Sequence, residues 1–357
     1  MSEPELIVIL GAGINGLTCA LEIQRRNPTW QVDLIAQVLP GDPPPFAWST
    51  GYSYFNRFEH TEYFSAETIE EGKVLALPNF QVLQPDQLVE GAKHGLTFTS
   101  VSVMPDQVIN RLLSEFGSCG GRIFRGTVRH LNEIIEAPSA IVVCVGIGAR
   151  TIGGIEDTSL RPMRIQVLKL RAPWMTVGKA FYGEDNVPTF FAIPLGSGDV
   201  LVGSKPDYDD WFAKPRPQTT IVLLNQARKF CPELIPTNAG PDYDLSSLLV
   251  WEGCDIFGMR NGGPRLEVKL APSTVISEGV HIIYNYGYGP SELQVFQGAA
   301  EAVANLLGAA IEQGKNSDMS DDQLVSALQS PDIDDDGQMA DGEILSVPAN
   351  NITDGGS

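Results

Sequence analysis

The chain begins with an apolar run, a glycine-rich turn, an amphipathic segment and a second apolar run. Residues 5–10 and 31–36 have the length and apolar content of buried strands. Between them, apolar side chains recur at helical spacing from Leu17 to Ile23. This pattern predicts a βαβ unit of the size found in mononucleotide-binding folds.

The hydrophobic pattern changes twice further along the chain. Between residues 164 and 204 it breaks into short β-segments, which predicts an antiparallel sheet inserted into the first domain. A buried strand at residues 280–287 and a helix at residues 294–311 then resume the first pattern. The expected fold class is α/β, with a Rossmann-like dinucleotide-binding domain and an inserted β-rich (α+β) domain. The expected boundaries are residues 1–162 and 275–312 for the first domain, 163–274 for the inserted domain, and 316–357 for an acidic, loosely ordered tail.

Charge and composition narrow the function classes. The formal net charge is -20 at pH 7, which argues against nucleic acids and anionic membranes as partners. The apolar runs are too short to span a bilayer, and the five cysteines form no Cys-x-x-Cys pair, so no membrane span and no metal are expected. Because neither a signal peptide nor a C-terminal peroxisomal tripeptide is visible, the expected location is cytoplasmic.

Three glycines mark the turn between the first strand and the first helix. In Gly11-x-Gly13-x-x-Gly16, the first glycine permits a tight turn and the second lets a phosphate approach the backbone. The third lets the helix and the strand pack closely, and the helix N-terminus adds amide donors for an anion. The sequence therefore predicts that a dinucleotide pyrophosphate is bound by Gly11, Ala12, Gly13, Ile14, Asn15 and Gly16.

The end of the second strand departs from the usual dinucleotide-binding pattern. An acid commonly binds a ribose hydroxyl there, whereas this strand is followed by Gln37. Gln37 can accept the same hydrogen bond without a charge, or the ribose is bound from elsewhere in the chain. The glycines by themselves do not separate FAD from NAD.

Further segments, in order along the chain, resemble the D-amino-acid oxidase family and most of all its fungal members. The resemblance extends from residue 6 to about residue 309. It implies FAD as the cofactor, bound between an FAD-binding domain and a β-rich substrate domain. The segments are residues 142–150 beside the flavin, 154–157 with 162–166 at the crossing into the substrate domain, 260–267 with a substrate-binding arginine, and 286–288 with 298–301 at a flavin-contacting turn and its helix.

The resemblance also implies an oxidative deamination. A D-amino acid gives a hydride to the flavin, the imino acid hydrolyses to a 2-oxo acid and ammonia, and O2 reoxidises the flavin with release of H2O2. Arg265 matches the family's arginine that pairs with the substrate carboxylate and orients the substrate. Besides the glycine turn, the expected cofactor contacts are Gln37, Ser49, Thr50, Val128, Gly146, Gly287 and Gln294.

Three positions differ from the family pattern. Phe191 replaces one pocket tyrosine and lacks its hydroxyl, and Lys205 replaces the other. Lys205 either pairs with a second carboxylate, which would favour D-aspartate or D-glutamate, or faces solvent beside neighbouring aspartates. Glu292 replaces a glycine next to the flavin, so that it brings a carboxylate to the place where the reduced flavin becomes anionic.

These observations support three hypotheses. The first is an FAD-dependent oxidase of a D-amino acid, with a small amino acid or amine as substrate and O2 as partner. The second is a biosynthetic flavin oxidase of a larger amine, and the third is a catalytically silent flavin-binding relative. The chain is compatible with a homodimer.

The acidic tail contains one pattern of its own. Residues 332–343 have the spacing of a calcium-binding loop, with its turn glycine and final acid. Prolines at both flanks and the lack of a second loop favour acidic composition over a calcium site as its origin.

Overall fold

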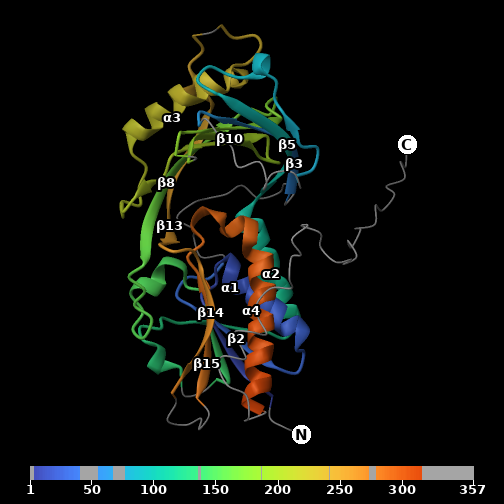
Figure 1. The fold of residues 1–357 in the computed structure, drawn as a ribbon, viewed down its shortest axis with the longest axis vertical. Helices are drawn as coiled ribbons and strands as arrows, with labels where there is room; N and C mark the ends of the chain where they lie inside the picture. Colours follow the sequence, from blue (N-terminus) through green and yellow to red (C-terminus); the bar gives the residue numbers. More distant parts are fainter. Residues whose placement is uncertain are drawn as a thin grey trace, which may run out of the picture.

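The structure is a computed structural model that describes residues 4–40, 55–66, 77–135, 138–185, 187–240, 242–272 and 279–315. Within these residues the chain forms two β-sheets, which lie one above the other in Figure 1. The predicted α/β class, with a largely parallel sheet and a largely antiparallel second sheet, is confirmed. The helices are α1 Ile14–Arg26, α2 Pro105–Ser118, α3 Pro217–Phe230 and α4 Glu292–Lys315, and the 3-10 helices are η2 Pro85–Gln87, η3 Leu131–Glu133, η4 Gly146–Arg150, η5 Pro232–Leu234, η6 Leu245–Leu248 and η7 Gly289–Ser291.

The six-stranded sheet, in the lower half of Figure 1, contains the predicted βαβ unit. Strands β1 (Leu6–Leu10) and β2 (Gln31–Ala36) pair in parallel and are connected by α1. Neighbouring strands run parallel, except that the edge strand β14 is antiparallel to β15. Because the carboxyl ends of parallel strands meet at one edge, the turn after β1 lies beside the segments that follow its neighbours. The order is β14-β15-β7-β1-β2-β6, with β6 Arg122–Arg125, β7 Ala140–Val143, β14 Arg265–Ala271 and β15 Val280–Tyr286.

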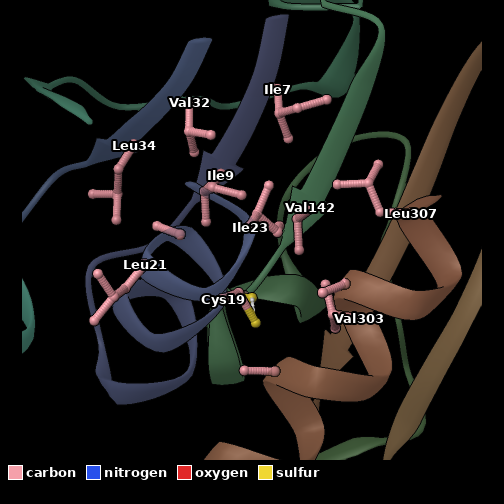
Figure 2. Packing of buried hydrophobic residues seen from close by; sticks show 14 of the residues in the cluster. Ile7, Ile9, Cys19, Leu21, Ile23, Val32, Leu34, Val142, Val303 and Leu307 are labelled. Atoms are coloured by element: carbon pink, nitrogen blue, oxygen red, sulfur yellow. Dashed lines mark hydrogen bonds between the residues drawn. The ribbon is translucent and has the colours of Figure 1, made fainter. Parts of the chain in front are cut away.

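Both faces of the six-stranded sheet are buried, as parallel strands require. On one face, α1 and α4 pack against the strands, and Figure 2 shows Ile9, Val142 and Val303 in this core. On the other face, a second core includes Leu10 and Tyr284 and is closed by residues of η3 and η4. The sheet is therefore a rigid base for the residues at its carboxyl edge.

The nine-stranded sheet forms the upper half of the molecule in Figure 1. Its strands are antiparallel to their neighbours, except that β3 pairs in parallel with β9. Helix α3 covers one face, where Leu168 and Phe190 pack with Leu223, and the other face is turned toward the six-stranded sheet. The order is β12-β8-β11-β10-β9-β3-β5-β4, with β13 also paired to β8; the bounds are β3 Phe55–Phe64, β4 Gln81–Val82, β5 His94–Val103, β8 Leu160–Arg171, β9 Val177–Tyr182, β10 Pro188–Pro194, β11 Asp199–Ser204, β12 Asp207–Tyr208 and β13 Leu249–Arg260.

Some strands join a different sheet from the one that their place in the sequence suggested. β14 lies within residues 163–274, yet it pairs along its whole length with β15 in the six-stranded sheet. β3 and β5 lie within residues 1–162, yet they pair in the nine-stranded sheet. The physical reason is that a strand pairs with whichever strand lies beside it in the folded protein. The local hydrophobic pattern predicts that a segment is a strand, but it does not predict the partner of that strand.

Several expected features lie outside the described residues. These are the cofactor contacts at Ser49 and Thr50, the acidic tail at residues 316–357, and the calcium-like spacing at residues 332–343 within it. In the part of the chain that is described, no helix has the length and apolar character needed to cross a membrane.

Candidate functional site

The glycine turn between β1 and α1 is shaped by close contacts. Gly11 has φ +101°, and a Cβ there would lie 2.4 Å from the carbonyl oxygen of Cys144. A Cβ on Gly16 would lie 1.9 Å from the carbonyl oxygen of Gly11. By contrast, a Cβ on Gly13 would meet no described atom within 4 Å. Packing therefore requires glycine at the first and third positions, whereas Gly13 borders open space.

The N-terminus of α1 follows this turn directly and has the character of an anion site. Among the described residues no side chain caps the helix, and its first turn carries no acid. Asn15 is 6% exposed, and its Oδ1 has no hydrogen-bond partner in the described chain. Ile14 is buried instead against Val108 and Phe296. The first backbone N–H groups of a helix lack partners within it, and beside open space these donors fit a pyrophosphate.

A cavity of about 570 Å³ continues from the turn along the carboxyl ends of β1, β2 and β6. Gly11, Ala12, Gln37 and Val128 line it, and all of them are among the expected cofactor contacts. An orphaned polar atom, an open cradle and a neighbouring cavity together fit one half of a dinucleotide.

Other residues that line the same cavity were not among the expected cofactor contacts, and four of them follow the elements at this edge. Thr127 and Arg129 follow β6, and Thr151 and Ile152 follow η4. None of them belongs to a motif. The available signal was their position just after a strand or turn that ends at the carboxyl edge, where ligands bind in α/β sheets.

The strand order indicates how a dinucleotide crosses this edge. β1 carries the glycine turn, with β2 and β6 on one side of it and β7 and β15 on the other. The cavity is lined by the ends of β1, β2 and β6, and residues that follow β7, such as Val145 and Gly148, close it. A dinucleotide bound with its pyrophosphate at Gly13 and one nucleoside in this cavity would leave its other half to the segments that follow β7 and β15.

On that side, hydrogen-bonded charges join the two sheets. At the end of β13, Arg260 Nε donates to Asp157 Oδ2 at 2.9 Å, and the Tyr286 hydroxyl donates to the same oxygen at 3.0 Å. On β14, Arg265 Nη1 donates to the Tyr286 hydroxyl at 2.8 Å, and Arg265 Nε donates to Glu267 at 2.7 Å. We call these five residues the junction network. It holds two guanidinium groups near the carboxyl edge of β15.

The junction network fixes the charge of its central groups. Burial raises the pKa of Asp157, but hydrogen bonds from Arg260, from the Ser159 amide and from Tyr286 outweigh burial and lower it overall. Burial raises the pKa of Tyr286 to about 12. At neutral pH, Asp157 is therefore ionised and Tyr286 is neutral.

The two arginines of the junction network differ in surroundings. Arg265, the expected carboxylate-binding residue, is 13% exposed, and its guanidinium carbon lies 3.6 Å from the centre of the Tyr284 ring. Arg260, which was not expected, is 25% exposed. It passes close to Gly287, where φ is +93° and a Cβ would lie 2.8 Å from the Cβ of Arg260. Arg260 is thus the less enclosed of the two.

The two altered pocket positions lie in different environments. Phe191 points away from the α3 side of β10, and a Cβ on its partner Gly203 would lie 2.2 Å from the Phe191 ring. Lys205 follows β11, is 49% exposed, and pairs at 2.5 Å with Asp185 in the loop between β9 and β10. A second substrate carboxylate would have to compete with Asp185 for Lys205.

Two remaining expected cofactor contacts also lie near the carboxyl edge. Gly146 has φ +53° and begins η4 shortly after β7. Gln294 lies exposed in the first turn of α4.

A carboxyl group of helix α4 and one of strand β13 act on each other at the junction. Glu292 is the first residue of α4, and Asp255 lies on β13. Burial, together with the charge of Asp255, raises the pKa of Glu292 to about 7. Burial also raises the pKa of Asp255, against a hydrogen bond from the Ile256 amide. A carboxyl group that titrates near neutral pH is therefore present on the β15 side of the edge.

The fold and this edge define a dinucleotide-binding protein, and comparison with known proteins specifies the family. Residues 42–306 match the family model described as DAO, FAD dependent oxidoreductase. The match covers well over half of the chain, so the protein belongs to this family and its cofactor is FAD. The glycine turn at residues 11–16 precedes the matched residues, and its own geometry supports pyrophosphate binding there.

Curated relatives cover most of the chain. A D-aspartate oxidase of Cryptococcus neoformans var. grubii is 27% identical, over 84% of this chain and 96% of that protein. A D-amino-acid oxidase of Schizosaccharomyces pombe is 23% identical, over 84% of this chain and 95% of that protein.

Solved structures share the fold at lower identity. Glycine oxidase from Geobacillus kaustophilus has a TM-score of 0.58 at 14% identity, and covers 90% of this chain and 96% of its own. The L-alpha-glycerophosphate oxidase from Mycoplasma pneumoniae with FAD bound has a TM-score of 0.60 at 12% identity, and covers 86% and 95%. The expected resemblance to the D-amino-acid oxidase family is confirmed.

Proposed function

We propose that the protein is an amino acid oxidase that converts a D-amino acid to a 2-oxo acid, ammonia and H2O2, with O2 as the electron acceptor. The observation that carries the proposal is the junction network, which holds two arginines on the side of the FAD-binding edge that faces the nine-stranded sheet. An arginine suits bidentate capture of a carboxylate. The D-amino-acid and D-aspartate oxidases among the relatives support this reaction class.

The residues of the chain bind and orient the substrate in this reaction. FAD, when bound, accepts the hydride from the substrate carbon and passes the electrons to O2. An arginine of the junction network pairs with the substrate carboxylate and fixes the α-carbon in one orientation.

Arg260 fits carboxylate binding better than Arg265, although Arg265 was the residue expected from the sequence. Both arginines use Nε and Nη1 for protein partners: Arg265 donates to Glu267 and Tyr286, and Arg260 donates to Asp157 and to the Gly263 carbonyl. Arg265 in addition stacks on a tyrosine ring. Arg260 is more exposed than Arg265. If Arg260 bound a substrate carboxylate instead of Asp157, Asp157 would still accept a hydrogen bond from the Tyr286 hydroxyl. Arg265 then acts as a positioning residue through Tyr286.

An acidic substrate is the finer form of the proposal. The D-aspartate oxidase relative favours it. Lys205 is the expected partner of a second carboxylate, which would have to replace Asp185 at the ammonium group. Cytoplasmic location and a homodimer stay predictions.

A larger amine as substrate is the second candidate. Phe191 offers no hydroxyl to a substrate, and Asp255 and Glu292 bring negative rather than positive charge to the junction. Both features disfavour a second substrate carboxylate and favour a substrate with an apolar or basic extension.

Peroxide release across D-alanine, D-aspartate, D-glutamate, D-lysine and D-phenylalanine tests the proposal. We expect turnover of at least one of them by the FAD-loaded protein. With Lys205→Met, turnover of D-aspartate is expected to fall by no more than about tenfold, since exposed ion pairs contribute little, while D-alanine turnover stays unchanged. An equal loss on both would remove Lys205 from substrate recognition. A yellow protein without peroxide from any D-amino acid would favour the larger amine.

A further inference from the structure

Two thiols lie in contact directly behind the glycine turn. Cys19 of α1 lies in the core shown in Figure 2 and is 0% exposed, and Cys144 follows β7 and is 6% exposed. Their sulfur atoms are 3.9 Å apart. The two side chains thus already face each other, as two cysteines must before a disulfide can form between them.

Cys144 also forms part of the wall behind the glycine turn. Its amide donates to the Leu10 carbonyl at 2.9 Å. Its own carbonyl oxygen is the atom that a Cβ on Gly11 would meet at 2.4 Å, and a Cβ on Gly16 would lie 3.5 Å from the Cβ of Cys144. Because these contacts are close, a shift of Cys144 would also move the turn that fits the pyrophosphate.

A buried amide group holds the two thiols in place. Asn285 of β15 is 0% exposed, and its Nδ2 donates to the sulfur of Cys19 at 3.2 Å and to that of Cys144 at 3.8 Å. Its Oδ1 accepts from the Tyr288 hydroxyl at 2.7 Å. The contact with Cys19 and burial raise the pKa of the Cys144 thiol well above its usual value, so this thiol reacts slowly with oxidants.

We propose that Cys19 and Cys144 form an oxidation site, at which H2O2 converts the two thiols to a disulfide and thereby weakens the binding of FAD. The oxidant is a product of the proposed oxidase reaction, and in this respect the inference rests on the proposed function. Cys144 directly precedes Val145, which lines the cofactor cavity together with Gly11. Peroxide released at the cofactor site is therefore produced at the same edge of the sheet as the pair.

The step balances in atoms and electrons. H2O2 first oxidises one thiol to a sulfenic acid, with release of one water. The second thiol then attacks the sulfenic sulfur, an S–S bond forms, and a second water leaves. The two thiols together lose two electrons and two protons, and H2O2 is reduced to two waters.

Disulfide formation would distort the wall behind the glycine turn. The two sulfurs, now 3.9 Å apart, would have to approach to the roughly 2.0 Å of an S–S bond. Both residues are buried in a close-packed core, so α1 and the end of β7 would have to move with them. Because shape changes of this kind cost free energy, we expect the dissociation constant of FAD to rise about tenfold.

The test uses the FAD-loaded full chain, treated for several hours with millimolar H2O2 and then with catalase. We expect peptide mapping without reductant to find Cys19 linked to Cys144, and the dissociation constant of FAD to rise about tenfold. Dithiothreitol is expected to restore both the free thiols and the FAD affinity. Because the peroxide is added, no substrate is needed, so a failed substrate panel and a missing cross-link are distinct results. Oxidised protein without the cross-link would overturn the proposal.

Two variants complete the test. Cys119→Ser removes an exposed thiol and is expected to lose FAD affinity on oxidation as the unchanged protein does. Cys19→Ser removes one partner of the buried pair, so its FAD affinity is expected to be the same before and after peroxide. Equal losses in both variants, or a cross-link that leaves FAD affinity unchanged, would overturn the proposal. If Cys19→Ser fails to fold, the peptide map of Cys119→Ser and its recovery with dithiothreitol decide the outcome.

Discussion

The six-stranded and nine-stranded sheets bring different kinds of groups to the site. At the edge of the six-stranded sheet, the groups that fit the cofactor belong to the backbone: Gly11 and Gly16 allow a tight turn, and the N-terminus of α1 offers amide donors. At the nine-stranded sheet, the groups are side chains such as Phe191 and Asp255, each on a different strand. Backbone geometry tolerates few sequences, whereas side chains on a stable sheet can change without loss of the fold. The FAD-binding edge therefore depends on glycines at fixed positions, whereas the side chains on the nine-stranded sheet could be exchanged without loss of the fold.

The largest expected effect is that of a substitution in the glycine turn of the six-stranded sheet. Gly16→Ala would put a methyl group 1.9 Å from the carbonyl oxygen of Gly11, so the turn must move. We expect the free energy of unfolding to fall by about 3 kcal/mol and FAD to be lost on purification. Denaturant unfolding and the flavin absorbance of the purified protein measure these two effects.

Gly13→Ala is the matched control for that change. Its methyl group meets no described atom within 4 Å, so the free energy of unfolding of the FAD-free protein should change by less than about 1 kcal/mol. FAD affinity should still fall, because the methyl group occupies the space in front of the helix N-terminus. Normal FAD affinity in Gly13→Ala would mean that the pyrophosphate lies elsewhere.

The second expected effect is a pH dependence of the free energy of unfolding, caused by Glu292 at the junction between the sheets. The pKa of Glu292 is raised to about 7 in the folded chain, so the folded state binds the proton more tightly than the unfolded state does. The resulting stabilisation is complete below about pH 4.5 and is lost as the pH rises to about 7, a change of about 3 kcal/mol. Unfolding of the FAD-free chain from pH 4.5 to pH 8 should show this dependence relative to Glu292→Gln. A constant difference between the two proteins across this range would contradict the raised pKa.

The smallest expected effect is the loss of kcat/KM when an arginine of the junction network is replaced. Arg260→Ala should lower kcat/KM for whichever amino acid is oxidised by roughly 30-fold, or about 2 kcal/mol, through loss of a charge-assisted pair. FAD affinity should be unchanged. Arg265→Ala should have a weaker effect on kcat/KM and a larger effect on thermal stability, because Arg265 is more enclosed and stacks on Tyr284. A loss of kcat/KM confined to Arg265→Ala would show that Arg265 binds the carboxylate.

Local sequence patterns were sufficient to predict the elements around the glycine turn. The apolar runs around Gly11, Gly13 and Gly16 predicted a strand, a turn and a helix, and β1, α1 and β2 have this arrangement. These features involve residues close in sequence, so their geometry follows from short-range sterics and hydrogen bonding. The inserted antiparallel strands were also evident from their apolar spacing.

The partners of the remaining site residues depend on the tertiary structure. The pairing of β14 with β15 brings Arg265 to Tyr286, and β13 brings Arg260 to Asp157, across 103 positions of the chain. No local pattern marks such partners, because the packing of two sheets creates the contact. The sequence by itself thus determined that this protein holds a dinucleotide. The raised pKa of the Glu292 carboxyl and the different enclosure of Arg260 and Arg265 depend on burial and on neighbours that exist only in the folded chain.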